Sequence, residues 1–467
     1  MIRVRAINSW IRTPLLLMAA AESAVLFSSL YVAGIITCGS VADCEAVIGL
    51  IAPKALLITS FVLVSFIAMG LYQFHQRFWY REAVLRVLVG LSAGFAAAAV
   101  IFYAFPDFAV DRPVANIAYG YSLVLLMALR FYFVRTVDTN IFRRRTLVYG
   151  AGERAASLMD FRRSADRRGF KIVGKVSAPG DTIVGDRSEV LNSEEKSIAD
   201  IALERNADEI VIAMDEKRGN LPVRQLLDAR LQGIDVIELM EFFERETGKI
   251  RVDLVNPGWL IFSPGFRISR LRAFSSRTVD LLASATLILV SWPIMLIAAL
   301  AIKIEDGFRA PALYRQCRVG KGGIPFDVLK FRSMSVDAEA DGKAKWAEEN
   351  DSRVTRVGNI LRGARLDELP QVFNVLRGQM SLVGPRPERP EFVQELKKTI
   401  PYYDERHAVK PGVTGWAQLK YSYGASEEDA IEKLQYDLYY IKNQKLMLDV
   451  MIILQTVEVV LWGKGAR

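Results

Sequence analysis

The chain has 467 residues, a net charge of +8 and 51% hydrophobic residues. This length exceeds one ordinary domain, and the hydrophobic fraction is typical of a membrane protein rather than a large soluble enzyme. Lys and Arg gather beside apolar segments instead of forming a separate basic tract, which argues against nucleic-acid binding and favours anionic lipid headgroups and diphosphates. The 2 histidines and 3 cysteines leave no zinc-ligand spacing, so carboxylates must carry any catalysis.

Four apolar runs predict transmembrane helices at residues 14–37, 55–72, 87–105 and 113–129. The first run contains one charge, Glu22, and the others contain none. Each approaches the about 20 residues that span hydrocarbon. Arginines precede the first helix, separate the second from the third and follow the fourth, at Arg3, Arg5, Arg12, Arg77, Arg81, Arg86, Arg143, Arg144 and Arg145. The positive-inside rule therefore places both ends of this region in the cytoplasm.

Cys38 and Cys44 fall in the loop that follows the first predicted helix, on the outer side of the membrane. An oxidising compartment would favour a disulfide between them, although a short loop gains little entropic stabilisation from one. The alternative is that the two cysteines form no disulfide and are simply small apolar residues near a helix end. Both interpretations stay open.

A strand at residues 146–149 runs into Gly150-Ala151-Gly152-Glu153-Arg154-Ala155, which fits the G-x-G-x-x-G/A dinucleotide pattern. Further strands are predicted near 171–177, 209–213 and 234–238, so we expect a Rossmann-like cytoplasmic domain at residues 143–262. Gly150, Gly152 and Ala155 are the candidate nucleotide-binding residues. The second strand does not end in the acidic residue that would hold an NAD ribose, which favours a structural or regulatory role without redox chemistry.

A fifth apolar run covers residues 281–302, with arginines before it and cations after it, so the charge rule gives no crossing direction. Pro293 lies at its centre, where it removes a backbone donor and bends a helix. We therefore predict a re-entrant helix at residues 278–303 that enters and leaves by the cytoplasmic face, with Ser291 and Pro293 at the hinge. A kinked spanning helix is the alternative. The apolar stretch at 450–462 contains Glu458 and predicts a helix lying on the membrane surface.

Two acidic residues, Asp367 and Glu368, precede apolar positions with one-face helical spacing at 369, 372, 373 and 376. We expect them at the N-terminus of that helix, with Pro370 in its first turn and Gly378 past its end. There they could bind Mg²⁺ and act on a phosphate. An isolated aspartate at this place would more often be a helix cap.

Cations accompany the carboxylates. A strand predicted at 326–334 puts Lys330 and Arg332 on one face, where they could clamp a diphosphate or simply face solvent. Arg386 lies between Pro385 and Pro387, and both prolines restrict its backbone. The carboxylate pair upstream favours phosphate binding by this arginine over a plain rigid turn.

The motifs KFRSM at 330–334, RLDELPQ at 365–371, SLVGPRPE at 381–388 and KPGVTGWAQ at 410–418 occur together in this order. In these motifs, residues 265–467 resemble the bacterial polyprenyl-phosphate phosphoglycosyl transferases that initiate exopolysaccharide assembly. The four predicted N-terminal helices and the middle domain resemble the long form of that family. The family places a Ser-Pro pair at the break of its membrane helix, whereas Ser291 and Pro293 are separated by Trp292 here.

The resemblance implies transfer of a sugar-1-phosphate from a UDP-sugar to polyprenyl phosphate with release of UMP. Asp367 would be the nucleophile and would form a covalent aspartyl phosphosugar, with Mg²⁺ held by Asp367 or Glu368. Lys330, Arg332, Arg365, Arg386 and Glu388 would bind the substrate. The resemblance also implies a homodimer in the bacterial inner membrane, with its catalytic domain on the cytoplasmic face and in contact with membrane lipids.

The expected fold is a transmembrane helical bundle at 1–142, a Rossmann-like α/β domain at 143–262 and a mixed α/β catalytic domain with a re-entrant helix at 263–467. Two other functions stay open. Membrane-bound nucleotide-sugar dehydratases also join four helices to a Rossmann domain, but they need a Tyr-x-x-x-Lys pair, which this sequence lacks. A non-catalytic scaffold of polysaccharide export would leave Asp367 and Glu368 dispensable.

Overall fold

The computed structural model describes the chain apart from residues 1–12, 73–79, 107–108, 137–142, 160–168, 185–189, 192–195, 217–219, 256, 264, 267–269, 336–352, 422–423, 425 and 463–467. Arg3, Arg5, Arg12 and Arg77, on which the predicted sidedness partly rests, lie outside the described residues. The chain forms two compact units, Met1–Thr247 and Gly248–Arg467.

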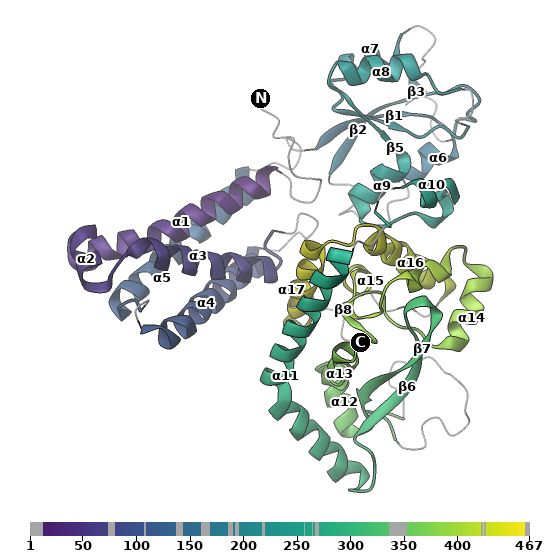
Figure 1. Ribbon diagram of the computed structural model, residues 1–467. Coiled ribbons are helices and arrows are strands. Elements are labelled where there is room, and N and C mark those ends of the chain that lie inside the picture. Colours follow the sequence, from purple (N-terminus) through teal and green to yellow (C-terminus); the bar gives the residue numbers. More distant parts are fainter. Residues whose placement is uncertain are drawn as a thin grey trace. The chain divides into compact units, whose positions relative to one another are not determined.

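Unit 1 begins with long apolar helices, as predicted (Figure 1). They are α1 (Thr13–Cys38), α3 (Ile51–Ala68), α4 (Tyr80–Ala104) and α5 (Arg112–Thr136), with the short α2 (Val41–Ile48) between the first two. The second span begins four residues before its predicted start at 55 because Lys54 is accommodated: its side chain is buried and Nζ donates to the Ala109 carbonyl at 2.7 Å. Cys38 and Cys44 are free thiols in this structure.

Glu22, the one charge of the first predicted span, is fully buried in the bundle. Its carboxylate accepts hydrogen bonds from Arg130 on α5, from Nε at 2.6 Å and from Nη2 at 3.0 Å. A buried charge requires such a partner in an apolar surrounding. The pair therefore ties α1 to α5.

A five-stranded parallel sheet with the order β3-β2-β1-β4-β5 follows in unit 1. Its strands are β1 (Arg144–Tyr149), β2 (Phe170–Val176), β3 (Val190–Leu191), β4 (Glu209–Ile212) and β5 (Asp235–Glu238). The helices around it are α6 (Glu153–Ala156), α7 (Ile198–Glu204), α8 (Val223–Leu231) and α9 (Leu239–Thr247). Leu147, Ile210 and Ala202 are among the residues of its buried core, as expected for strands covered by helices. The predicted α/β region is therefore present.

Unit 2 starts before the predicted border at residue 263, because the preceding segment packs within it. Trp416 donates from Nε1 to the Gly248 carbonyl at 2.8 Å, and Lys249 pairs with Glu432 at 2.9 Å. The helices are α10 (Pro257–Phe262), α11 (Arg270–Asp306), α12 (Arg356–Gly363), α13 (Gln371–Leu376), α14 (Pro390–Thr399), α15 (Trp416–Lys420), α16 (Glu427–Lys442) and α17 (Leu446–Trp462). The strands are the antiparallel pair β6 (Leu313–Val319) and β7 (Pro325–Phe331) and the parallel pair β8 (Ser381–Val383) and β9 (Gly412–Thr414).

Helix α11 is 37 residues long and contains Pro293 and Ser291, whose hydroxyl donates to the Leu287 carbonyl at 2.6 Å. It runs along one side of unit 2 (Figure 1). Within this unit it contacts α12, α13, β8 and α17. Before Pro293, the Asp280 carboxylate accepts from the Ser381 hydroxyl and the Leu382 N–H, both at 2.9 Å. After it, Ala298 and Ile302 share a buried core with Phe331 and Leu361.

Candidate active site

The two candidate catalytic carboxylates lie in a tight turn between two helices. Arg365 adopts a left-handed conformation, with φ 53°, and Leu366–Glu368 then form a 3-10 turn. Helix α13 begins only at Gln371, so the prediction that Asp367 and Glu368 start this helix is wrong by one turn. The reason is local: Pro370 has no N–H, and residues 369, 372 and 373 donate to carbonyls three positions back. Gly378 follows α13 with φ 79°, as predicted.

Glu368 is held by two cations. Its Oε1 lies 3.1 Å from Lys330 Nζ and 2.7 Å from Arg386 Nη2. Burial alone would raise the pKa of this carboxyl, but the charges of Arg386 and Lys330 hold the pKa well below its usual range. Glu368 is therefore a fixed anion that keeps both cations in place.

Asp367 differs from its neighbour. Burial and the adjacent Glu368 charge raise the pKa of Asp367, although Lys330, Arg362 and Arg386 oppose them. The Asp367 side chain makes no hydrogen bond or ion pair with any residue that the structure describes. A partly buried carboxylate with unengaged oxygens next to two cations can accept a phosphorus or metal centre.

The structure thus brings together Asp367, Glu368, Lys330 and Arg386 of the predicted site. Arg332 lies one residue past the end of β7, and its Nη1 is buried without a partner among the described residues. Arg365 contributes the left-handed backbone residue directly before the 3-10 turn that contains Asp367. Glu388 lies elsewhere: its carboxylate is 3.5 Å from Arg318.

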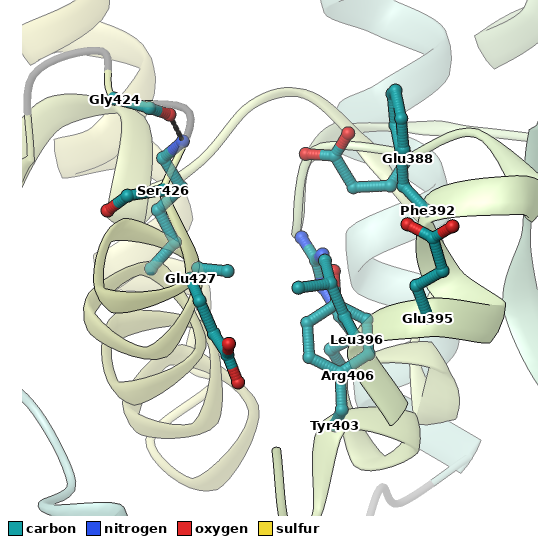
Figure 2. Close-up of a pocket in the computed structure, with 11 residues that line it drawn as sticks. Glu388, Phe392, Glu395, Leu396, Tyr403, Arg406, Gly424, Ser426 and Glu427 are labelled. Carbon is teal, nitrogen blue, oxygen red and sulfur yellow. Dashed lines mark hydrogen bonds between the residues drawn. The ribbon is translucent and has the colours of Figure 1, made fainter. Parts of the chain in front are cut away.

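Glu388 lines a separate cavity of about 160 Å³ between α14, the turn at Tyr403–Ala408 and α16. Figure 2 shows Glu388 and Glu395 on one wall and Glu427 on the opposite wall. Arg406 also lines this cavity and donates from Nη2 to the Arg386 carbonyl at 3.0 Å. The cavity therefore adjoins the backbone of Arg386.

Two of the motifs on which the resemblance rests lie side by side. Strand β8 and Gly384 come from SLVGPRPE, and β9 comes from KPGVTGWAQ. Gly384 N–H donates to the Thr414 carbonyl at 2.9 Å, and Gly412 N–H donates to the Pro385 carbonyl at 2.9 Å. A Cβ on Gly384 would lie 2.4 Å from the Lys410 carbonyl oxygen, so only glycine fits this close approach. The pairing fixes the backbone from which Arg386 extends.

The glycine-rich loop of unit 1 is occupied by carboxylates of the chain itself. Ala151 N–H donates to Asp181 at 2.9 Å. Asp215 accepts from Glu153 N–H at 3.1 Å and from Arg154 N–H at 2.9 Å, and a Cβ on Gly152 would lie 1.8 Å from its Oδ2. These are the backbone donors that a dinucleotide phosphate uses in such loops.

Sequence reasoning missed Asp181 and Asp215, and it missed Asn374 on α13. Asn374 is fully buried, and its side chain bonds β7. The available signal was a polar residue inside the apolar pattern of a predicted helix.

Comparisons with known proteins agree with these motifs. A model of the bacterial sugar transferase family matches residues 271–463. The UDP-N-acetylgalactosamine-undecaprenyl-phosphate N-acetylgalactosaminephosphotransferase of Aeromonas hydrophila is 43% identical over 247 residues, which are 52% of this chain and 56% of that protein. The undecaprenyl-phosphate glucose phosphotransferase of Komagataeibacter xylinus is 33% identical over 70% of this chain and 61% of its own length.

The chain thus spans less than two thirds of these two relatives. It covers more of the UDP-glucose:undecaprenyl-phosphate glucose-1-phosphate transferase of Klebsiella pneumoniae, to which it is 35% identical over 71% of this chain and 70% of that protein. The matched region contains the Asp367 turn, Lys330 and Arg386. The chain belongs to the bacterial sugar transferases, the family of polyprenyl-phosphate phosphoglycosyl transferases.

Proposed function

We propose that the protein transfers a sugar-1-phosphate from a UDP-sugar to polyprenyl phosphate, with undecaprenyl phosphate as the natural acceptor, and releases UMP. This would be the first membrane step of exopolysaccharide assembly. The relatives act, by name, on undecaprenyl phosphate with glucose or N-acetylgalactosamine donors. The observation that carries the proposal is the Asp367 carboxylate, which no described residue bonds, beside Glu368, which Lys330 and Arg386 fix in place.

In the first step, an Asp367 oxygen attacks the phosphorus next to the sugar. A new P–O bond forms, the P–O bond to UMP breaks, and UMP leaves with the electron pair. In the second step, a phosphate oxygen of the lipid attacks the aspartyl phosphosugar and frees the Asp367 carboxylate. The covalent intermediate thus divides one displacement between two anionic partners into two easier steps. Burial raises the pKa of Asp367 and leaves its carboxylate poorly solvated, which makes it more nucleophilic.

Lys330 and Arg386 would stabilise the negative charge of the reacting phosphates. Glu368 already holds both side chains in place without a substrate, so they need little rearrangement when a diphosphate binds. The Nη1 of Arg332, which has no hydrogen-bond partner in the described part of the chain, is a further donor that a phosphate oxygen could satisfy.

The residues fit Mg²⁺, because the donors are carboxylate oxygens and Asp367 is unengaged among the described residues. The described residues contain no group of three or more acidic, His or Cys side chains that could hold a metal, so the diphosphate and water would complete the coordination. Asp367 or Glu368 would hold the ion, which neutralises charge on the leaving UMP when bound.

We also propose that α11 is re-entrant. Arg277 and Asp280, before Pro293, and Ile302, after it, all contact the same compact unit. A helix that crossed the bilayer would place its ends on opposite sides, so contacts with one unit before and after the proline support a re-entrant helix. Between them lie exposed apolar side chains suited to lipid, including Leu289, Val290 and Ile297. Periplasmic labelling of a cysteine at position 309, with cytoplasmic labelling at 270, would refute this arrangement.

The remaining parts complete the proposal. The order β3-β2-β1-β4-β5 supports a Rossmann-like domain with a structural or regulatory role. The protein would work as a homodimer in the bacterial inner membrane, with the site on the cytoplasmic face where UDP-sugars are made.

The direct test is incubation of the purified protein in lipid nanodiscs with Mg²⁺, polyprenyl phosphate and a panel of radiolabelled UDP-sugars that includes UDP-glucose and UDP-N-acetylgalactosamine. We expect label in the lipid phase and stoichiometric UMP for at least one donor. Conversion of the sugar without lipid product would favour a dehydratase. No turnover with any donor would favour a scaffold.

A further inference from the structure

Asn374 is a fully buried polar side chain that bonds a neighbouring strand with both ends of its carboxamide. Its Oδ1 accepts from the Leu329 N–H at 2.9 Å. Its Nδ2 donates to the Asp327 carbonyl at 2.7 Å and to Gln379 Oε1 at 2.9 Å. A buried amide with three bonds is costly to disturb, because each lost partner leaves an unsatisfied group.

The two bonds to β7 have the geometry of a sheet ladder. Among the described residues, β7 pairs with β6 along one edge, in a sheet of two strands. Residues 327 and 329 are two apart, so the carbonyl of one and the N–H of the other point to the same edge. Asn374 satisfies both and takes the place of a third strand.

This connection joins the two halves of the candidate site. Lys330 is the next residue on β7, and its Nζ lies 3.1 Å from Glu368. Glu368 lies in the turn directly before α13, the helix that carries Asn374. The Asn374 carboxamide therefore fixes β7, which carries Lys330, against α13, which follows the turn that contains Glu368.

We propose that Asn374 is a positioning residue, which keeps Lys330 beside Glu368 and Asp367 by holding β7 on α13. The inference rests on the proposed transfer reaction. It assigns Asn374 no contact with substrate.

Asn374→Asp tests it with a nearly isosteric change. An aspartate keeps an acceptor for the Leu329 N–H but presents lone pairs to the Asp327 carbonyl. We expect kcat/KM for the UDP-sugar to fall about 10–100-fold, because Lys330 would bind the diphosphate and small displacements of charged groups have such effects. Gln379→Ala is the matched control: it removes one bond of the carboxamide but leaves both bonds to β7, and it should keep kcat/KM within about twofold.

A double-mutant cycle with Lys330→Met separates positioning from general structural damage. If Asn374 acts through Lys330, Asn374→Asp should lower turnover little further in the Lys330→Met background. An equal fold-loss in both backgrounds would overturn the inference while leaving the proposed function intact. Failure of the wild-type protein to transfer from any donor would instead overturn the proposed function.

Amide exchange on the wild-type protein needs no variant. The Leu329 N–H lies at the edge of β7 that does not pair with β6, and it should exchange slowly because Asn374 accepts its hydrogen bond. Rapid exchange at this amide in the folded protein would overturn the inference even if the variants do not fold.

Discussion

Carboxylates lie beside the start of a short helix in both units, and they differ in what their oxygens contact. At the glycine-rich loop, Asp181 and Asp215 accept backbone N–H groups of residues 151, 153 and 154. At the 3-10 turn of unit 2, Asp367 accepts none among the described residues, and its neighbour Glu368 binds two cations instead. Saturated carboxylates build structure, whereas an unengaged one beside fixed cations can react.

The same difference separates the glycine-rich pattern at residues 150–155 from the carboxylate pair at residues 367 and 368, although both patterns predict a phosphate site. The G-x-G-x-x-A pattern predicts a phosphate cradle, yet Asp215 occupies the donors that a phosphate would use. A dinucleotide would first have to displace this side chain. At Asp367 the sequence signal and the available oxygens agree.

The largest effect should come from Asp367→Asn. The amide cannot form the phosphosugar ester, so we expect transfer and the covalent adduct to fall by at least about 1,000-fold. Radiolabel transfer and intact-mass detection of the adduct measure this. More than a few per cent of wild-type activity would contradict the nucleophile assignment.

Glu368→Gln should lower transfer about 100-fold and change its Mg²⁺ dependence. The neutral amide no longer holds Lys330 and Arg386, and it is a poorer metal ligand. A titration of activity with Mg²⁺ measures both effects. An unchanged Mg²⁺ response would remove Glu368 from the metal site and leave it the task of holding the two cations.

Arg386→Lys should have a smaller effect, about tenfold on transfer. Lysine keeps the charge but loses the planar fork that binds Glu368 and would bind a phosphate oxygen at the same time. Steady-state kinetics with the best donor measure the change. A loss as large as that of Asp367→Asn would show that the guanidinium does more than binding and charge neutralisation.

Asp215→Asn should leave transfer within about twofold but lower the stability of unit 1 by about 1–3 kcal/mol, because it weakens acceptance from two helix N–H groups. Thermal unfolding in nanodiscs and the radiolabel assay check both parts. Titration of the wild-type protein with NAD⁺ supplies the control, and tight binding would show that the loop opens.

Much of the architecture is readable from the sequence, because its signals are local. The apolar runs, the strand that leads into Gly150 and the glycine after α13 each need only a short window. Lys330, Asp367, Glu368 and Arg386 could also be grouped, through motif order. The start of α13 at Gln371 was misplaced because Pro370 removes a donor, which shifts the bonding to a 3-10 pattern.

Long-range contacts of single side chains could not be predicted. Asp215 reaches Arg154 across 61 residues, and Asn374 reaches Asp327 across 47. Glu388 belongs to the same sequence motif as Arg386, yet it lies beside Arg318 instead of Glu368. Such contacts depend on how whole elements approach each other, which no short pattern encodes.

Helix α11 has a practical consequence for anyone who wishes to purify the catalytic unit. A fragment that began after Asp306 would lose Ala298 and Ile302 from the core shared with Phe331 and Leu361. It would also leave the first N–H groups of α12 without the Glu305 carboxylate that accepts them at 2.9–3.3 Å. Because α11 contributes to the core of this unit, we expect such a fragment not to fold. We also expect a preparation that keeps α11 to need lipid or detergent around its exposed apolar side chains.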